Sequence, residues 1–280
     1  MKKTIGALNM ISAYKLLCCP LCKSAVTEAL ECPSCAEKYT LRDGVYVMIH
    51  PELSGKEWKW NESHFSQEGD ELSQRYSSFI NEETRNAHRI WRDGMTQYVD
   101  MFHGYVIDIA TGLGGLFRNL LESKADFFPI ATDVDPNVLV WTKRKMKEKY
   151  PKAFLAVASD AKHLAFRSDV LNYATSRSGL NNIPDTALAL KELCRALKHG
   201  GKFVVMHTFV EEDSHSATLA RQRNTERAFI ERYLIGDLIE AGFRDVKTNI
   251  VASAIWAENP MDLLPVAGDT QYFAIIEAEK

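Results

Sequence analysis

Five of the six cysteines fall within eighteen residues near the amino terminus, and four of them form two matched pairs. The pairs are Cys19/Cys22 and Cys32/Cys35, each with a proline after its first cysteine and with nine residues between them. A Cys-x-x-Cys turn can aim two thiolates at one point, and two such turns supply the four sulfurs of a tetrahedral zinc site. These four residues are therefore the predicted zinc ligands, in a closed structural site whose first role is folding.

Cys18 directly precedes the first pair and is the alternative ligand. The Cys-Pro-x-Cys form shared by both pairs favours Cys19, so we expect Cys18 to be a spectator. Disulfides or loose thiols are the alternative interpretations of the whole cluster. Metal-ligating thiols favour a reducing compartment, and we expect a cytoplasmic protein. The mildly apolar stretch at residues 5–13 imitates a secretory signal, but Asn9 and Ser12 interrupt it.

A second chemical pattern begins at residue 105. The near-continuous apolar run at 105–110 predicts a strand buried on both faces. A turn containing Gly112, Gly114 and Gly115 follows, and then an expected helix at 116–121. Strand, glycine turn and helix together place backbone N–H groups at the carboxyl edge of the sheet, where open α/β sheets bind their ligands.

The next strand, expected at 126–132, ends in an acid. Asp133 lies 25 residues after Asp108, and a carboxylate at that place can accept hydrogen bonds from both hydroxyls of a ribose. Asp135 and Pro136 suit the N-cap and the first residue of the following helix. We therefore expect Asp133 to bind a ligand and Asp135 to be structural.

Strands and helices continue to alternate to the end of the chain. Further strands are expected at 154–158, 170–176, 202–208, 245–256 and 271–278. Helices are expected at 185–197, ended by a glycine stop at 199–201, and at 228–241, ended by Gly242. This order predicts a doubly wound parallel α/β sheet.

Two families of this architecture compete. Nucleotide dehydrogenases have Gly-x-Gly-x-x-Gly after the first strand, but Phe117 stands where the third glycine belongs. The series Asp108-x-Ala110-x-Gly112-x-Gly114 instead resembles the first motif of class I S-adenosylmethionine-dependent methyltransferases of the type 11 kind. Ala110 replaces the usual first glycine and is its smallest substitute.

The resemblance extends from about residue 105 to 280. Residues 131–136 look like the second motif, whose acid holds the cofactor ribose. Ser159, Asp160 and Ala161 look like the third, whose Asp-Ala pair meets the adenine edge. The resemblance to this family implies a Rossmann-like seven-stranded sheet with an antiparallel last strand. It also implies these S-adenosylmethionine-binding residues: Asp108, Ala110, Thr111, Gly112, Gly114, Asp133, Val134, Asp160, Ala161 and Ser176.

The residues before this domain suggest two further parts. Residues 16–51 resemble the zinc ribbons of methyltransferase activators, which also occur fused in front of methyltransferases. The segment at 54–102 is rich in aromatic residues, and its apolar positions from Ala87 have helical spacing, with Asn81 as the expected cap. We expect a zinc ribbon at 12–53, a helical linker or lid at 54–102, and a methyltransferase domain at 103–280.

The methyl acceptor is open to three hypotheses. A small molecule is favoured because the net charge is only −3 and no Asn-Pro-Pro-Tyr motif follows the fourth strand, where Ser176 and Arg177 are expected to face the reacting centre. The second is RNA, since ribosomal RNA guanine-N1 methyltransferases also place a zinc module before this fold. Its best basic cluster, residues 143–147, is expected to be a solvated helix face. The third is a non-catalytic scaffold whose ribbon contacts a protein partner. The sequence contains no run of 18 apolar residues, so no membrane span is predicted. No residue is assigned as catalytic.

Overall fold

The computed structural model describes residues 13–53, 69–260 and 262–280. The signal-like stretch, except for Ala13, and the aromatic residues Trp58, Trp60 and Phe65 of the expected lid lie outside these described residues.

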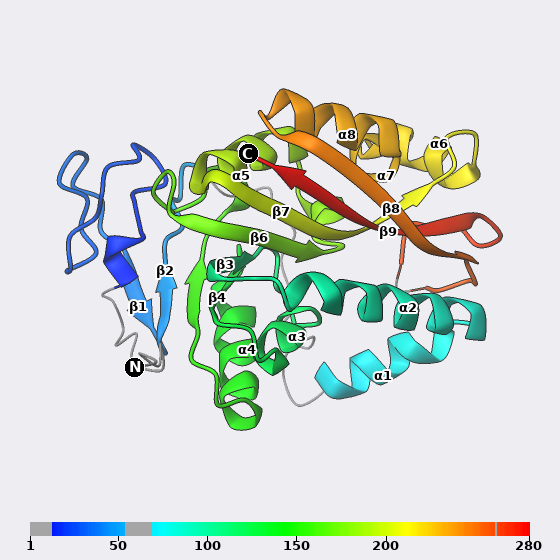
Figure 1. Cartoon of the computed structure of the whole chain (residues 1–280), viewed down its shortest axis with the longest axis horizontal. Coiled ribbons are helices and arrows are strands. Elements are labelled where there is room, and N and C mark those ends of the chain that lie inside the picture. The colour runs from blue at the N-terminus through cyan, green and yellow to red at the C-terminus, as the bar shows by residue number, and fades with distance from the viewer. Residues whose placement is uncertain (1–12, 54–68, 261) are drawn as a thin grey trace.

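Within the described residues, nine strands form one mixed sheet in the order β1-β2-β5-β4-β3-β6-β7-β9-β8 (Figure 1). Their bounds are β1 Thr40–Arg42, β2 Val45–Val47, β3 Gly104–Asp108, β4 Phe127–Asp133, β5 Leu155–Ala158, β6 Leu171–Arg177, β7 Leu197–Val210, β8 Arg244–Ile255 and β9 Thr270–Glu279. The helices are α1 Gly69–Phe79, α2 Glu82–Val99, α3 Phe117–Glu122, α4 Pro136–Lys149, α5 Thr186–Ala196, α6 His215–Gln222, α7 Glu226–Phe229 and α8 Glu231–Glu240. Short 3-10 turns are η2 Ala13–Lys15, η4 Ala161–His163 and η5 Leu180–Asn182.

The central strands confirm the predicted fold class. Strands β5, β4, β3, β6 and β7 are parallel, and β9 runs antiparallel between β7 and β8. The sheet has two strands more than the expected seven because the ribbon contributes its own hairpin. Strand β2 pairs in parallel with β5, matching Tyr46 with Val157 and Val47 with Ala158, so the hairpin extends the sheet of the following α/β domain.

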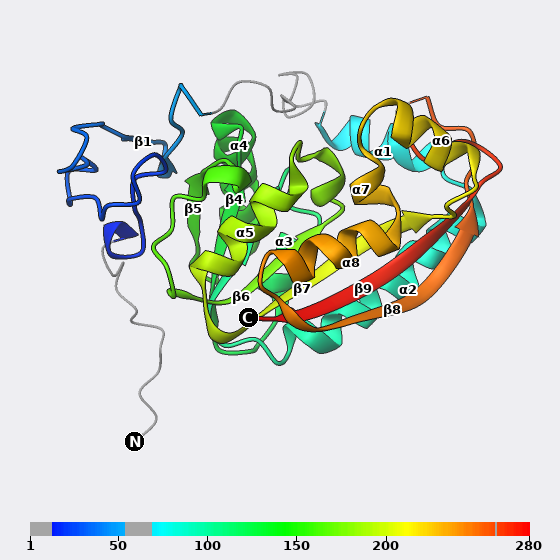
Figure 2. The same cartoon turned by 90° about the horizontal axis from the view of Figure 1, so that it is seen from above.

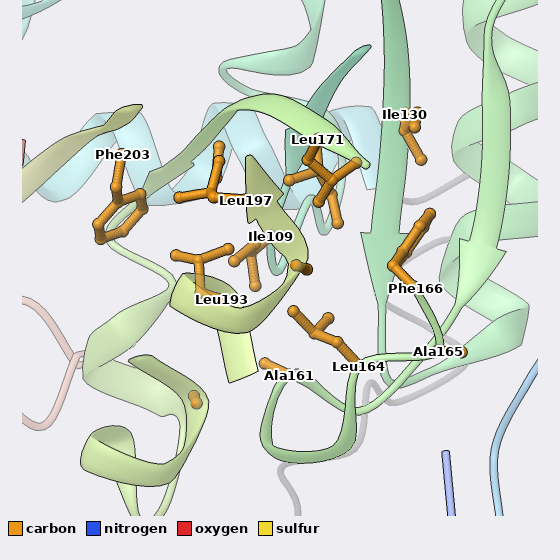
Figure 3. Packing of buried hydrophobic residues seen from close by; sticks show 14 of the residues in the cluster. Ile109, Ile130, Ala161, Leu164, Ala165, Phe166, Leu171, Leu193, Leu197 and Phe203 are labelled. Atoms are coloured by element: carbon orange, nitrogen blue, oxygen red, sulfur yellow. The ribbon is translucent and has the colours of Figure 1, made fainter. Parts of the chain in front are cut away.

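Helices cover both faces of the sheet (Figures 1 and 2). Because side chains alternate along a strand, neighbouring residues of β3 enter opposite cores. Val106 packs with α2 and α3 residues such as Trp91 and Phe117, whereas Ile107 packs with α5 residues such as Leu193. Figure 3 shows the second of these cores. A strand that is apolar on both faces must bury each face, and these two cores cover one face each.

Side-chain caps fix the beginnings of two helices as predicted. Asn81 accepts a hydrogen bond of 2.7 Å from the backbone N–H of Thr84 at the start of α2. Asp135 accepts one of 2.8 Å from Asn137 at the start of α4, with Pro136 as its first residue. These caps satisfy N–H groups that have no partner inside the helix.

Three expectations about helices are wrong. The expected glycine stop at 199–201 does not end α5, because Leu197 is already extended and pairs with Leu171 of β6. The expected helix at 228–241 is broken by the extended backbone of Ile230 into α7 and α8. Lys143 is not solvated: it is buried and its ammonium donates a hydrogen bond to the carbonyl of Gly44 in the ribbon hairpin.

Candidate active site

A cavity of about 750 Å³ opens at the carboxyl edge of the parallel strands. Its size lies in the range of small-molecule sites, roughly 300–1,000 Å³. Most of the residues expected to bind the cofactor line it: Ala110, Thr111, Gly112, Asp133, Val134, Asp160 and Ala161. Asp108, Gly114 and Ser176 are not among the lining residues.

The turn after β3 takes a left-handed backbone at three alternate residues. The φ angles are +51° at Ala110, +51° at Gly112 and +80° at Gly114. Glycine adopts this conformation freely, whereas the same backbone conformation at an alanine costs roughly 1–2 kcal/mol of conformational free energy. Thr111 stabilises the turn, since its backbone N–H donates to Thr132 at 2.8 Å and its hydroxyl donates to the Asp108 carbonyl at 2.9 Å.

Asp133 connects the end of β4 to that turn. Its Oδ2 accepts the backbone N–H of Gly112 at 2.9 Å, and its Oδ1 accepts that of Asp135 at 3.1 Å. Burial raises the pKa of this carboxyl to about 6. Each oxygen can accept a further hydrogen bond, so a fixed carboxylate with spare acceptor capacity faces the cavity and fits a ribose diol.

The three remaining cofactor-site candidates lie behind the cavity wall. Asp108 is buried at the end of β3, its Oδ1 has no hydrogen bond among the described residues, and burial raises its pKa to about 8. Ser176 donates its hydroxyl to the Ile109 carbonyl at 2.8 Å. A Cβ on Gly114 would lie 2.3 Å from the methyl carbon of Met146. These positions support the turn, and a direct role in binding stays a prediction.

Asp160 begins η4 at the next position along the sheet edge. Its Oδ1 accepts the backbone N–H of Lys162 at 2.9 Å, and its other oxygen lies 3.8 Å from the Lys162 ammonium. The carboxylate is thereby fixed beside Ala161 at the cavity. The structure brings the three motifs together as the resemblance implies.

The cavity is also lined by residues that follow β6, β7 and β8, here called its far end, and the sequence alone predicts no role for these residues. They are Asn181, Asn182, Arg223, Phe229, Asp262, Leu263 and Leu264, and Arg177 lies with them. Strand β8 is parallel to β7, because β9 is antiparallel to both. Its carboxyl end therefore lies at the ligand edge, and this topology was the signal that could have pointed to the loop carrying residues 262–264.

The Tyr76 side chain of helix α1 contacts a residue of the cavity wall. The Tyr76 hydroxyl donates to Asp262 Oδ2 at 2.7 Å, and the Asn259 amide donates to the same oxygen at 2.9 Å. Burial raises the pKa of Asp262. Part of the segment expected to be a lid thus contacts the wall of the cavity.

The four predicted zinc ligands converge in the ribbon. Their sulfurs all lie within 4.8 Å of one another, with separations of 3.6 Å for Cys19–Cys35, 3.4 Å for Cys22–Cys32 and 3.9 Å for Cys22–Cys35. Sulfurs about 2.3 Å from a tetrahedral zinc would be about 3.8 Å apart. The donor set therefore fits zinc, and zinc binding stays a proposal.

The two turns that present these thiols have the same backbone. Lys23 and Ala36, each directly after its second cysteine, have φ angles of +62° and +60° and donate to the carbonyls of Cys19 and Cys32. Cys18 has a different environment: its buried thiol donates to the carbonyl of Phe166 at 3.1 Å. It lies outside the group of four sulfurs.

The comparisons with known proteins identify the fold and family. The ubiE/COQ5 methyltransferase family model matches residues 62–219. The chain belongs to the ubiE/COQ5 methyltransferase family. A ubiquinone/menaquinone biosynthesis C-methyltransferase UbiE from Rickettsia massiliae is 30% identical over 125 residues, which are 42% of this chain and 50% of that protein. The chain thus spans about half the length of the curated relatives it matches.

Solved structures show the same fold. A phosphoethanolamine N-methyltransferase 2 from Haemonchus contortus, in complex with S-adenosyl-L-methionine, matches with a TM-score of 0.55 and 18% identity over 80% of this chain and 60% of that one. A complex of the Haloferax volcanii Trm112 methyltransferase activator and a methyltransferase matches with a TM-score of 0.51 and 17% identity, covering 70% and 92% of the chains. The chain therefore has the fold of class I S-adenosylmethionine-dependent methyltransferases. In the described part of the chain, no helix is long and apolar enough to cross a membrane.

Proposed function

We propose that this protein methylates a small molecule, and that the acceptor atom is a ring carbon. The shape of the cavity supports the first part, because cofactor-end residues such as Asp133 and far-end residues such as Phe229 line one enclosure. The names of the UbiE relatives support the second part. A cavity of about 750 Å³ that also receives the cofactor favours a compact acceptor group.

The cofactor would be held at three places along the sheet edge. Asp133 would accept the ribose hydroxyls, Asp160 and Ala161 would meet the adenine, and the backbone of Gly112 would lie against the amino-acid part. When bound, S-adenosylmethionine supplies an electrophilic methyl group on a positively charged sulfur. The main task of the protein is then to align the acceptor and exclude water.

Asp262 is our candidate for the group that takes the proton of a carbon acid. It lines the cavity, and burial raises its pKa above that of an ordinary carboxyl, which makes it the stronger base. Both of its hydrogen bonds reach Oδ2. Its Oδ1 has no hydrogen-bond partner among the described residues and is the atom that would accept the proton.

Support for an RNA acceptor is weaker. RNA binding would depend on the basic cluster at residues 143–147. In this cluster the Lys143 ammonium donates a hydrogen bond to the ribbon hairpin, and the Lys145 ammonium lies 5.3 Å from the ring centroid of Trp141. Steep salt dependence of RNA binding would be the sign of phosphate contacts.

Labelled methyl transfer tests the proposal. Zinc-loaded protein and methyl-labelled S-adenosylmethionine would be incubated with the organic-extractable metabolites and, separately, with the RNA of a cell extract. We expect label in the metabolite fraction and a loss of at least about tenfold in rate for Asp262→Asn. Incorporation into RNA alone would refute a small-molecule acceptor, and an unchanged rate in Asp262→Asn would refute the assigned base. Absence of any transfer would favour the scaffold hypothesis.

A further inference from the structure

Arg177 is a partly buried cation, and no acidic side chain of the described residues forms an ion pair with it. It ends β6 and is one of the residues that line the cavity. Among the described residues it makes no hydrogen bond and no ion pair, and its guanidinium carbon lies 5.6 Å from the centroid of the Trp91 ring. An arginine remains charged at all physiological pH values.

The electrostatic surroundings of Arg177 do not compensate this charge. The groups that act on it are Arg118 and Arg92, which with burial lower its pKa, and the Tyr76 hydroxyl. Arg223 adds a further positive side chain at the cavity. Asp262 also lines the cavity, but among the described residues it forms no ion pair with Arg177, and its Oδ2 accepts hydrogen bonds from Tyr76 and Asn259 instead. Burying an unpaired charge is expensive, so proteins rarely keep one without a partner or ligand.

Neighbouring residues fix the guanidinium in place. Trp91 is itself anchored, because its ring N–H donates to the Ala274 carbonyl at 2.7 Å and its ring packs edge-on against Phe273. The backbone of Gly115 also lies close to the guanidinium, since a Cβ at this position would lie 3.4 Å from an Arg177 nitrogen. A positioned guanidinium presents parallel N–H groups that suit a carboxylate or a phosphate.

We propose that Arg177 is the recognition site for an anionic group of the acceptor, so that the substrate is an acidic small molecule bearing a carboxylate or a phosphate. Asn181 and Asn182 at the same end of the cavity offer amide N–H groups to the remaining oxygens. This inference rests on the proposed small-molecule function and adds the chemical class of the acceptor to it.

Matched neutral and anionic probes test the assignment. The full-length, zinc-loaded protein saturated with S-adenosylhomocysteine would be titrated calorimetrically with benzoate against benzamide, and with phenyl phosphate against phenol. We expect the anion of at least one pair to bind at least about tenfold more tightly than its neutral partner. The pair that shows this preference identifies the anion as carboxylate or phosphate.

Variants assign the preference to Arg177. Arg177→Met should lose the anion preference, and Arg177→Lys should keep part of it. Arg144→Met, which removes an exposed arginine of α4, changes the net charge equally and should bind like the wild type. Because it removes an uncompensated charge, Arg177→Met should melt at or above the wild-type temperature. A clearly lower melting temperature would mean that Arg177 has a structural partner instead.

The proposal would be overturned if, in each pair, the anionic and the neutral probe bound with equal affinity, or if none of the four probes bound. Retention of the anion preference by Arg177→Met would overturn it as well. Neither result would affect the proposed function, which is judged separately by binding of S-adenosylhomocysteine and by labelled methyl transfer to the metabolite fraction.

Discussion

At the scale of single residues, two aspartates two positions apart have separable roles. Asp133 faces the cavity, whereas Asp135 caps α4. We expect Asp133→Asn to weaken binding of S-adenosylhomocysteine about 10- to 150-fold, because hydrogen bonds to a charged group contribute about 1.5–3 kcal/mol. The matched change Asp135→Ala should cost about 1 kcal/mol of stability through loss of the cap and leave the affinity nearly unchanged. Calorimetry and urea unfolding of both variants distinguish the roles, and equal losses of affinity would contradict them.

Asp108 should make stability depend on pH. Burial raises the pKa of its carboxyl from 3.8 to about 8 in the folded protein, so folding favours the protonated form. This contribution is complete below pH 3.8 and is lost as pH rises towards 8. The partly buried His88 and the buried His207, whose pKa values desolvation lowers to about 4, act in the opposite direction and only below about pH 6.5.

Relative to Asp108→Asn, the free energy of unfolding of the ligand-free wild type should therefore fall between pH 6.5 and 8, because the other groups that titrate in this window are common to both proteins. One proton bound only in the folded state contributes about 1.4 kcal/mol per pH unit, or about 2 kcal/mol over this window. Asp108→Asn keeps a neutral side chain of the same shape and should remove that decline. Urea unfolding of both proteins at the two pH values measures the difference, and parallel pH dependences would show that Asp108 does not titrate there.

At the scale of elements, one acid connects the ribbon to the methyltransferase. Glu192 of α5 pairs with Lys23 of the first knuckle at 2.5 Å and with Arg195 at 2.8 Å. Arg195 in turn donates to the carbonyls of Phe166 and Leu164, and the Cys18 thiol also contacts Phe166. The network thus joins the Cys19/Cys22 turn to the loop that follows Asp160 at the cavity.

Breaking this network should be costly. Glu192→Gln leaves two partly buried cations without their carboxylate, and we expect a loss of about 1–3 kcal/mol in unfolding free energy. Glu31→Gln is the control, because its ion pair with Lys38 is solvent-exposed and such pairs contribute about 0–1 kcal/mol. Chemical unfolding of the two variants tests the difference. An equal effect of both would mean that the contact of α5 with the ribbon is energetically unimportant.

The element scale also shows which features local sequence could predict. Caps such as Asn81 and strands such as β3 depend on neighbouring residues, so the pattern alone placed them. The end of α5 depends on pairing of Leu197 with Leu171, and the burial of Lys143 depends on the carbonyl of Gly44. These are contacts between distant residues, and periodicity carries no information about them. The far end of the cavity was missed for the same reason, because Tyr76 meets Asp262 across 186 positions.

At the scale of the whole molecule, the ribbon forms part of the sheet. The sequence analysis divides the chain at residue 53, and that division stays a prediction. Strand β2 nevertheless hydrogen-bonds to β5, and the hairpin turn is held to α4 by bonds from Lys143 to Gly44 and from Arg42 to Asn137. Without the hairpin, β5 would be an unprotected edge strand, and such edges promote aggregation.

We therefore expect the ribbon and the methyltransferase sheet to unfold together. Structural zinc sites of this kind couple metal binding to folding, so zinc release, followed with a chromogenic chelator, should coincide with the loss of far-ultraviolet circular dichroism in a single urea transition. Cys32→Ser should lower the stability of the whole chain and weaken binding of S-adenosylhomocysteine, although Cys32 is not among the cavity-lining residues. Release of zinc in an earlier, separate transition that leaves cofactor affinity intact would instead show that the ribbon is an independent domain. The shared edge of β2 and β5 is the physical reason to expect one transition, because opening the ribbon leaves the backbone N–H and C=O groups of β5 on that side without their partners.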